Sequence, residues 1–526
     1  MTAGQFIVSL CLLLVSSTVF AGDAPTSEQK RGREIYRSGQ MAGVAVGVAA
    51  IGADGMKLSS ASFSCASCHG VFGKGGREGG IAMPPLNWQR LTAAAVSTVS
   101  GRRRGAYTRE TLRLAIAAGL DPEHASLHES MPRFTMPDIR LSEVIAYLER
   151  IGDDEDTDPG VSPGTIRIGV ALPLSGPLAA AGVSIRETLE RVFAAASRDG
   201  GIYGRSIDLV VEDSRGESTG LRLATRRLVE SDNVFALVAS FTAGSGDEIG
   251  PLLEEFAIPL VGPVGLSPQP VGVPNPYVFY LMPGLYDQAR ALVDFIAARG
   301  GPEASPRPRL AVIYAGNAAD QAVIEGLRRQ AGVQGMEIVA EQEDAAHAVA
   351  SVLAKRPNYL VYAGDGAGLQ RVAAQLDRDD RDDRDSAPAL AGFLSTAQSG
   401  VNDLPARVAA RALFVAPAPP PDARQAAGFF SILPAGDALP TFAGLRAAAF
   451  ASGTVLVEAL RVTGGRLSRP GLVRTLERLQ HFETGVTPPI SFGPNRRNGN
   501  VGGVIFVFDP ERRSVRVASD WITPKE

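Results

Sequence analysis

From residue 165 onward, short apolar runs alternate with longer segments in which apolar residues recur every three or four positions. The apolar runs predict buried strands at 165–172, 206–213, 234–240, 309–316, 358–365 and 412–418. The segments between them, such as 184–201 and 221–231, predict amphipathic helices. This alternation favours parallel sheets with helices on both faces. About 360 residues exceed one comfortable hydrophobic core, so we expect two lobes.

Residues 22–151 follow a different pattern, in which helical periodicity dominates. The segment 141–151 places Val144, Ile145 and Leu148 on one face of a helix, and 107–121 predicts a second helix. Residues 152–164, GDDEDTDPGVSPG, combine five acidic side chains with Pro and Gly and have no apolar period. We expect 152–164 to be a solvated, extended linker between two domains that move independently unless their surfaces pack together.

Residues 1–21 contain no charged side chain, and an apolar run is followed by Val19-Phe20-Ala21. This pattern predicts a secretory signal peptide and export to the periplasm, although the usual Lys or Arg before the apolar run is missing. Retention as an anchor is the alternative, but the run is short for a bilayer span. The formal net charge of −4 gives no indication of nucleic-acid binding.

Three cysteines are present, and Cys11 would leave with the signal peptide. The other two form the stretch Cys65-Ala66-Ser67-Cys68-His69, which admits three interpretations. A thiol redox pair needs a preceding thioredoxin-like strand, and a structural zinc site needs four ligands that this chain does not offer. Covalent haem attachment needs two thiols one helical turn apart and an adjacent histidine. We favour haem attachment, with His69 on the iron.

The surrounding segments strengthen this interpretation. Gly32-Arg33-Glu34-Ile35-Tyr36 is similar to the first helix of class I c-type cytochromes, 107–121 to their middle helix and 141–151 to their closing helix. Over roughly 125 residues this region resembles that family, with 41–62 as an insertion. The resemblance implies an all-α domain over 22–151 that carries one haem c attached through Cys65 and Cys68.

The resemblance also implies His69 as the proximal iron ligand and a methionine in the loop before the last helix as the distal ligand. Met131, which precedes Pro132 and lies 16 residues before Tyr147, fits the family spacing; Met136 is the alternative. His124 and His128 are nearby, but each reads better as an exposed loop residue. Such ligation suits electron transfer rather than oxygen binding.

Residues 165–526 resemble the type I periplasmic solute-binding proteins, in particular the branched-chain amino acid and amide receptors of ABC transporters. The matching stretches are IGVALPLSGPLAAAG, GGIYGRSIDLVVED and FAIPLVGPVGLSP. The resemblance implies a small molecule bound in a cleft between two α/β lobes. Candidate ligand contacts are Thr242, Ser245, Ser267 and Asp365, although a plain loop role is open for each. The acidic partner of an amino-acid ammonium has no clear counterpart, which favours a less polar or uncharged ligand.

These features lead to two hypotheses about function. In the first, the protein is a periplasmic haem c electron carrier with a ligand-binding module, whose redox partner is an exported dehydrogenase or another cytochrome. In the alternative, it is the solute receptor of an ABC transporter, with an ABC permease as partner and an accessory cytochrome domain. No nucleophile–base pair or phosphate-binding loop stands out in 165–526, so we do not expect an enzyme.

Overall fold

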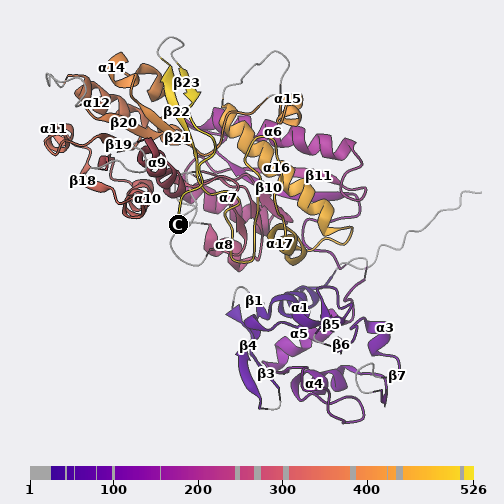
Figure 1. Ribbon diagram of the computed structural model, residues 1–526. Coiled ribbons are helices and arrows are strands. Elements are labelled where there is room, and N and C mark those ends of the chain that lie inside the picture. Colours follow the sequence, from indigo (N-terminus) through magenta and orange to yellow (C-terminus); the bar gives the residue numbers. More distant parts are fainter. Residues whose placement is uncertain are drawn as a thin grey trace, which may run out of the picture. The chain divides into compact units, whose positions relative to one another are not determined.

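The computed structural model describes residues 25–41, 44–52, 54–78, 80–96, 101–153, 156–242, 249–265, 274–299, 307–378, 387–422, 424–433, 442–509 and 514–526. The predicted signal peptide, 1–21, lies outside the described residues. The chain forms two compact units, which divide between Asp156 and Thr157 (Figure 1). We call them unit 1 and unit 2 and describe each by itself.

Unit 1 is built around two helices that cross each other, α1 and α5. Its helices are α1 (Ser27–Ser38), α2 (Cys65–His69), α3 (Trp88–Leu91), α4 (Arg109–Ala117) and α5 (Asp138–Leu148), with a 3₁₀ turn at Ser60–Ser62. Helix α1 begins with a capping box at Thr26 and Gln29 and ends at Gly39, whose positive φ closes the helix in the left-handed conformation. The buried faces of α1, α4 and α5 share one hydrophobic core.

Unit 1 also contains antiparallel strands, so the prediction of an all-α domain is wrong. The strands are β1 (Gln40–Met41), β2 (Val44–Ala45), β3 (Val48–Ile51), β4 (Met56–Ser59), β5 (Gly76–Glu78), β6 (Ile81–Met83), β7 (Ala95–Val96), β8 (Arg103–Arg104) and β9 (Arg133–Thr135). Strands β2, β3 and β4 lie within 41–62, the segment that the sequence predicts as an insertion, and β1 ends at its first residue. Its β3–β4 hairpin pairs with β9 in a three-stranded sheet of order β4-β3-β9.

The segment predicted as a solvated linker is partly buried. Asp156, 7% exposed, accepts hydrogen bonds from the Tyr147 hydroxyl (2.8 Å) and the Gly152 amide (3.1 Å) within unit 1. Within unit 2, Asp158 is 6% exposed and accepts one from the Arg469 amide, and Val161 joins the core. The expectation of a fully solvated linker is therefore wrong at these residues, because specific hydrogen bonds offset the repulsion between the acidic side chains.

Unit 2 consists of two α/β lobes, as predicted. Lobe 1 has a parallel sheet of order β11-β10-β12-β14-β16. Its strands are β10 (Thr165–Leu172), β11 (Ser206–Asp213), β12 (Ala236–Val238), β14 (Leu260–Val261) and β16 (Val278–Phe279), with a small additional pair, β13 (Phe241–Thr242) and β15 (Val264–Gly265). Its helices are α6 (Ala179–Arg198), α7 (Ser218–Glu230), α8 (Gly250–Glu255), α15 (Ala427–Ile432), α16 (Ala443–Thr463) and α17 (Arg469–Glu477).

Lobe 2 has a seven-stranded sheet of order β18-β17-β19-β20-β21-β22-β23, in which the last two strands are antiparallel. The strands are β17 (Arg309–Tyr314), β18 (Glu337–Glu343), β19 (Tyr359–Ala363), β20 (Ala389–Phe393), β21 (Leu413–Ala416), β22 (Val504–Asp509) and β23 (Ser514–Val517). The helices are α9 (Leu285–Arg299), α10 (Ala318–Gln334), α11 (Ala348–Leu353), α12 (Gly366–Asp377), α13 (Leu394–Ala397) and α14 (Ala406–Ala409), with a 3₁₀ turn at Gln398–Asp403.

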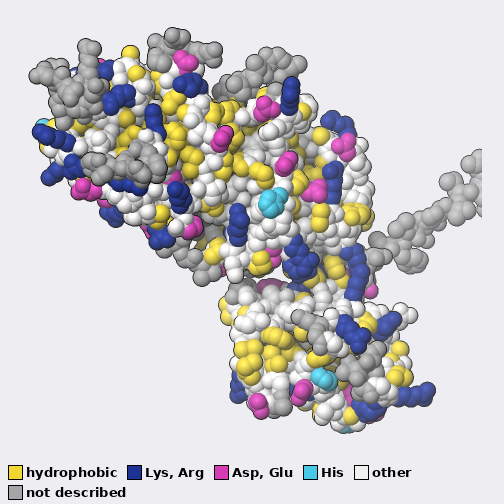
Figure 2. All heavy atoms as spheres, viewed as in Figure 1, with side chains coloured by type: hydrophobic (Ala, Val, Ile, Leu, Met, Phe, Trp, Pro, Cys, Tyr) yellow, Lys and Arg dark blue, Asp and Glu magenta, His cyan; other side chains and the backbone are white. Residues whose placement is uncertain are grey.

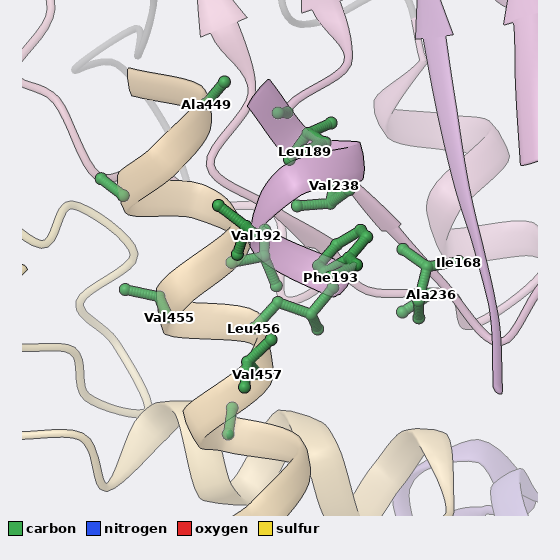
Figure 3. Packing of buried hydrophobic residues seen from close by; sticks show 14 of the residues in the cluster. Ile168, Leu189, Val192, Phe193, Ala236, Val238, Ala449, Val455, Leu456 and Val457 are labelled. Carbon is green, nitrogen blue, oxygen red and sulfur yellow. The ribbon is translucent and has the colours of Figure 1, made fainter. Parts of the chain in front are cut away.

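The chain passes between the lobes three times. Lobe 1 takes residues up to 281 and again 426–492, whereas lobe 2 takes 285–416 and 504–522, as their hydrophobic cores show. In the core of lobe 1, Leu189 and Phe193 of α6 face Leu456 of α16 and Val238 of β12 (Figure 3). Among the described helices, α16 alone is long and apolar enough to span a membrane, and 61% of that stretch is buried in this core.

Candidate functional site

The two candidate haem-binding cysteines lie on one short helix, α2. Its five residues are Cys65 to His69, so the two thiols are separated by about one helical turn. The two cysteines are not joined in a disulfide. Burial raises the pKa of the Cys65 thiol to about 12, so this thiol is protonated at neutral pH. Two reduced cysteines one turn apart are the arrangement that thioether bonds to a haem require.

His69 is held as an iron-binding histidine would have to be. Its ring is 6% exposed, and Nδ1 donates a hydrogen bond to the Pro84 carbonyl oxygen, at 2.9 Å. Burial lowers the pKa of His69 and favours the neutral ring. Because Nδ1 carries the proton, Nε2 is the ring nitrogen with a lone pair to donate to a metal. None of the described residues forms a hydrogen bond with Nε2.

The close packing of α1 against α5 positions helix α2. A Cβ at Gly32 would overlap the Glu143 carbonyl oxygen, so only glycine allows the two helices to approach this closely. One turn later, the Tyr36 ring packs against Tyr147 with 5.4 Å between ring centroids. The Tyr36 hydroxyl donates to the Gly70 carbonyl oxygen at 2.9 Å, directly after His69. Gly32 and Tyr36 of α1 thus both pack against α5.

The two candidate distal methionines flank β9, and both stay candidates. Met136 is half-buried and packs against the core cluster that also contacts Cys65. Met131 is also half-buried, and its carbonyl oxygen accepts a hydrogen bond from the Arg133 guanidinium. His124 and His128 are exposed in the preceding loop, as expected. The residues present fit a haem through their donor chemistry: two thiols, one oriented imidazole and a thioether loop.

A structural zinc ion fits this region less well. Among the described residues, no group of three or more His, Cys, Asp and Glu side chains is arranged to hold a metal. Structural zinc sites use four such ligands. Haem attachment, which needs only the two thiols and the adjacent imidazole, stays the prediction for Cys65-Ala66-Ser67-Cys68-His69.

In unit 2, two loops at the carboxyl end of the lobe 1 sheet lie side by side. Strand β13 follows β12, β15 follows β14, and the two pair in parallel, Phe241 with Val264 and Thr242 with Gly265. Ligands of open parallel sheets bind outside the carboxyl ends of strands. The Thr242 side chain, however, is 4% exposed and donates to the Val264 carbonyl oxygen at 3.4 Å, so its hydroxyl holds the two loops together.

Of the other three predicted ligand contacts, the structure describes only Asp365. Asp365 precedes α12 and caps it, because its Oδ1 accepts a hydrogen bond from the Gly368 amide at 2.8 Å. Its carboxylate thus has a structural role that needs no ligand. Ser245 and Ser267 lie outside the described residues. The structure therefore brings the segments of Thr242 and Gly265 to one edge of the sheet without assigning a ligand to Thr242.

Two polar clusters at strand ends were missed by the sequence analysis. Asp213 ends β11 and accepts hydrogen bonds from the Leu174 amide (2.9 Å), the Arg215 amide (2.8 Å) and the Ser175 hydroxyl (2.7 Å). Burial raises its pKa, but these hydrogen bonds outweigh burial and hold it below its usual value. In lobe 2, Asp344 follows β18 and accepts from Arg371 at 2.9 Å and from Tyr362 at 3.3 Å. An acidic residue that ends a predicted strand is the signal that would have found Asp213, whereas Asp344 follows β18, a strand that the sequence analysis did not predict.

Comparison with known proteins identifies unit 2. Residues 165–508 match the periplasmic binding protein family. The chain belongs to this family. Its members are periplasmic solute-binding proteins rather than enzymes, and membership implies export to the periplasm. The match begins at residue 165 and does not bear on unit 1.

Individual relatives are distant. A stretch of 131 residues is 28% identical to Leu/Ile/Val-binding protein homolog 3 of Brucella melitensis and covers 25% of this chain and 35% of that relative. The chain thus matches about a third of the curated relative's length.

Solved structures share the fold. They include a substrate-binding protein of an ABC transporter from Aeropyrum pernix (TM-score 0.57, 14% identity, 69% of this chain and 97% of that one). A fatty acid ABC transporter substrate-binding protein from Thermomonospora curvata has a TM-score of 0.55 at 16% identity, covering 70% and 95%. A leucine-binding protein from Thermotoga maritima has a TM-score of 0.52 at 17% identity, covering 68% and 99%. At these identities the similarity shows the fold alone.

Proposed function

We propose that this protein is a periplasmic receptor that binds a small organic solute between the two lobes of unit 2 and presents it to an ABC permease. Family membership supports a receptor better than an electron carrier as the main role of the chain. The observation that favours a site in lobe 1 is the pairing of β13 with β15, which aligns two loops at the carboxyl end of the sheet. Closure of the second lobe over such an edge would bury the solute.

The solute is an uncharged organic molecule in this proposal. An amino acid would need a carboxylate to pair with its ammonium group, and Asp365 is the described candidate. The Asp365 carboxylate already accepts the amide hydrogen of Gly368, and the Thr242 hydroxyl is buried against Val264. Both side chains therefore contribute to the framework of the two lobes, which supports recognition by apolar contacts and backbone groups.

Unit 1 carries one covalently attached haem c in this proposal. Cys65 and Cys68 form the thioether bonds, His69 is the proximal ligand, and Met131 is the distal ligand, with Met136 as the alternative. The Pro84 carbonyl oxygen orients the imidazole of His69, which supports this assignment. Once bound, a haem with these ligands supplies one-electron transfer at a raised reduction potential, with an exported dehydrogenase or another cytochrome as partner.

The haem assignment is tested by absorption spectra of the exported protein in its oxidised and reduced forms. We expect the sharp bands of a reduced c-type haem and a sulfur-to-iron charge-transfer band in the oxidised form. Loss of the charge-transfer band in Met131→Ala, and its retention in Met136→Ala, would assign the distal ligand. The reverse pattern would assign Met136. A purified protein without any haem would rule out this part of the proposal.

The receptor assignment is tested by titration calorimetry with amides, alcohols, amino acids and fatty acids. We expect an uncharged solute to bind, and Asp365→Asn to bind it equally well, because asparagine also caps helices. A loss of affinity of tenfold or more in this variant would show that the carboxylate contacts a cationic ligand instead. Uptake that survives deletion of residues 22–151 would support the receptor as the main role, whereas haem reduction by a dehydrogenase would support the electron carrier.

A further inference from the structure

The insertion in unit 1 builds a sheet on the loop that carries both candidate distal methionines. In this sheet, called the insertion sheet, β3 pairs with β4 on one side and with β9 on the other. The register with β9 places Val48 opposite Thr135, Ala49 opposite Phe134 and Ala50 opposite Arg133. Strand β9 lies between Met131 and Met136 in the sequence, and β3 is its pairing partner in this sheet.

The inner side of the insertion sheet belongs to the hydrophobic core of unit 1. Ala49 is 0% exposed and Phe134 is 4% exposed, and both lie in the cluster against which Cys65 and Met136 pack. On the outer side Val48 is 39% exposed, and Met56, which pairs with Ile51 on the same face as Ala49, is 59% exposed at the end of the hairpin. Figure 2 shows hydrophobic side chains on the part of unit 1 where Figure 1 labels β3 and β4. The hairpin thus adds one central apolar residue from β3 to the core and leaves much of its own apolar surface in water.

The base of the hairpin is tied to α1 and to the segment that precedes the haem motif. The Gly47 amide donates to the Ser60 hydroxyl at 3.1 Å, and this hydroxyl donates to the Gly39 carbonyl oxygen at 2.6 Å. A Cβ at Gly47 would overlap the Thr135 carbonyl oxygen and lie 3.0 Å from the Met136 Cβ. The backbone at Gly47 therefore lies directly against the end of β9.

We propose that the insertion sheet is a positioning device for the distal methionine, and that Gly47 is the residue that sets the position of the loop. This inference rests on the haem c of the proposed function. A methionine thioether is a neutral and exchangeable ligand, and a loop without a pairing partner is more mobile than a strand in a sheet. By fixing residues 133–135, the sheet restricts the segments on which Met131 and Met136 are presented. The insertion thereby raises the occupancy of the methionine-bound state.

The test compares Gly47→Ala with Gly76→Ala, a matched control. The control position has open space around its Cβ direction and an ordinary φ. Haem content, the sulfur-to-iron band, the pH at which this band disappears and the reduction potential are measured in both variants and in the wild type. We expect full haem content in Gly47→Ala and an equilibrium constant for displacement of the methionine that is about tenfold larger. The pH at which half of the sulfur-to-iron band is lost would then fall by about one unit. The reduction potential should fall as well, and Gly76→Ala should match the wild type.

A second variant covers the case in which Gly47→Ala does not fold. Residues 48–59 are replaced by a Gly-Ser-Gly bridge, which the proximity of Gly47 to Ser60 allows, and β3 and β4 are removed. An unchanged band and potential in the folded, haem-loaded variants would overturn the inference while leaving the proposed haem intact. An equal shift in Gly76→Ala would overturn it as well. A wild-type protein without haem would overturn the proposed function, and this inference with it.

Discussion

In the described part of unit 1 no strand is longer than four residues, whereas β10 and β11 of unit 2 each extend over eight. The strands of unit 2 alternate with helices that cover them, so each additional strand–helix pair enlarges an existing core. Unit 1 instead relies on individual close contacts, such as Gly32 against Glu143 and Tyr36 against Tyr147. We therefore expect the stability of unit 1 to be more sensitive to single residues than that of unit 2.

The largest expected difference between the units concerns the proposed haem. Replacement of Cys65 and Cys68 by serine should reduce covalently bound haem to near zero, because both thioether bonds are lost. The thermal transition of unit 1 should then move to a much lower temperature, while that of unit 2 stays unchanged. Calorimetry together with a haem assay on denatured protein checks both effects. Equal melting of unit 1 with and without the cysteines would show that its fold does not depend on the bound group.

The next largest effect is expected at the crossing of α1 and α5. Gly32→Ala forces the Cβ into the Glu143 carbonyl oxygen, and we expect the free energy of unfolding of unit 1 to fall by about 2–4 kcal/mol. Gly444→Ala is the matched control in unit 2. Gly444 lies in α16 with open space around it, so alanine should be neutral or stabilising there by up to about 1 kcal/mol. Denaturant unfolding of both variants measures the difference, and equal effects would contradict the comparison.

In unit 2, a buried carboxylate on α9 should make stability depend on pH. Burial raises the pKa of Asp287 to about 6, although Arg290 lies 3.9 Å away and acts in the opposite direction. A raised folded-state pKa gives stability that is present below about pH 4 and lost as the pH rises through 6. Asp287→Asn should therefore stabilise unit 2 at pH 8 by up to about 3 kcal/mol and have little effect at pH 4. Urea unfolding at both pH values checks this, and an equal effect at both would contradict it.

In unit 1, the carboxylate of Glu143 should make stability fall in acid, which is the opposite of the effect of Asp287 in unit 2. Burial raises the pKa of Glu143, but hydrogen bonds from Arg31 (2.5 Å) and Arg140 (2.8 Å) outweigh burial and hold the pKa below its usual value. A lowered folded-state pKa gives stability that is present at neutral pH and lost as the pH falls through that value. Glu143→Gln should cost about 2 kcal/mol at pH 7 and progressively less in acid. The pH dependence of unfolding distinguishes this from a packing defect, whose cost would not change with pH.

Much of unit 2 could be predicted from the sequence because its signals are local. The apolar runs at 165–172 and 206–213 coincide with β10 and β11, and the other predicted strands enclose β12, β17, β19 and β21. The haem assignment rests on five consecutive residues, Cys65 to His69, and stays a prediction. Prediction from local patterns fails where strands pair over a long separation in the sequence. Strands β3 and β9 lie more than 80 residues apart, and neither shows a clear alternation of apolar and polar residues.

The solute site was harder to predict for a related reason. Thr242 and Asp365 occupy strand ends where ligand contacts are expected, but their orientation depends on neighbours from other segments. The Val264 carbonyl oxygen binds the first side chain and the Gly368 amide binds the second. A hydroxyl or carboxylate at a strand end has the same appearance in the sequence whether it binds a ligand or the protein itself. Contacts of this kind emerge only from the folded chain.

Helix α16 has a consequence for secretion. An 18-residue stretch of this helix has a mean hydropathy of 1.3, which suits the core of lobe 1. A chain that crosses the membrane before it folds presents the same segment to the translocation channel, where sufficiently apolar segments leave sideways into the lipid. Arg446, Glu458 and Arg461 lie within α16 and make this lateral exit costly. The composition of α16 is thus limited from two sides, since more polar residues would weaken the lobe and more apolar residues would trap the protein in the membrane.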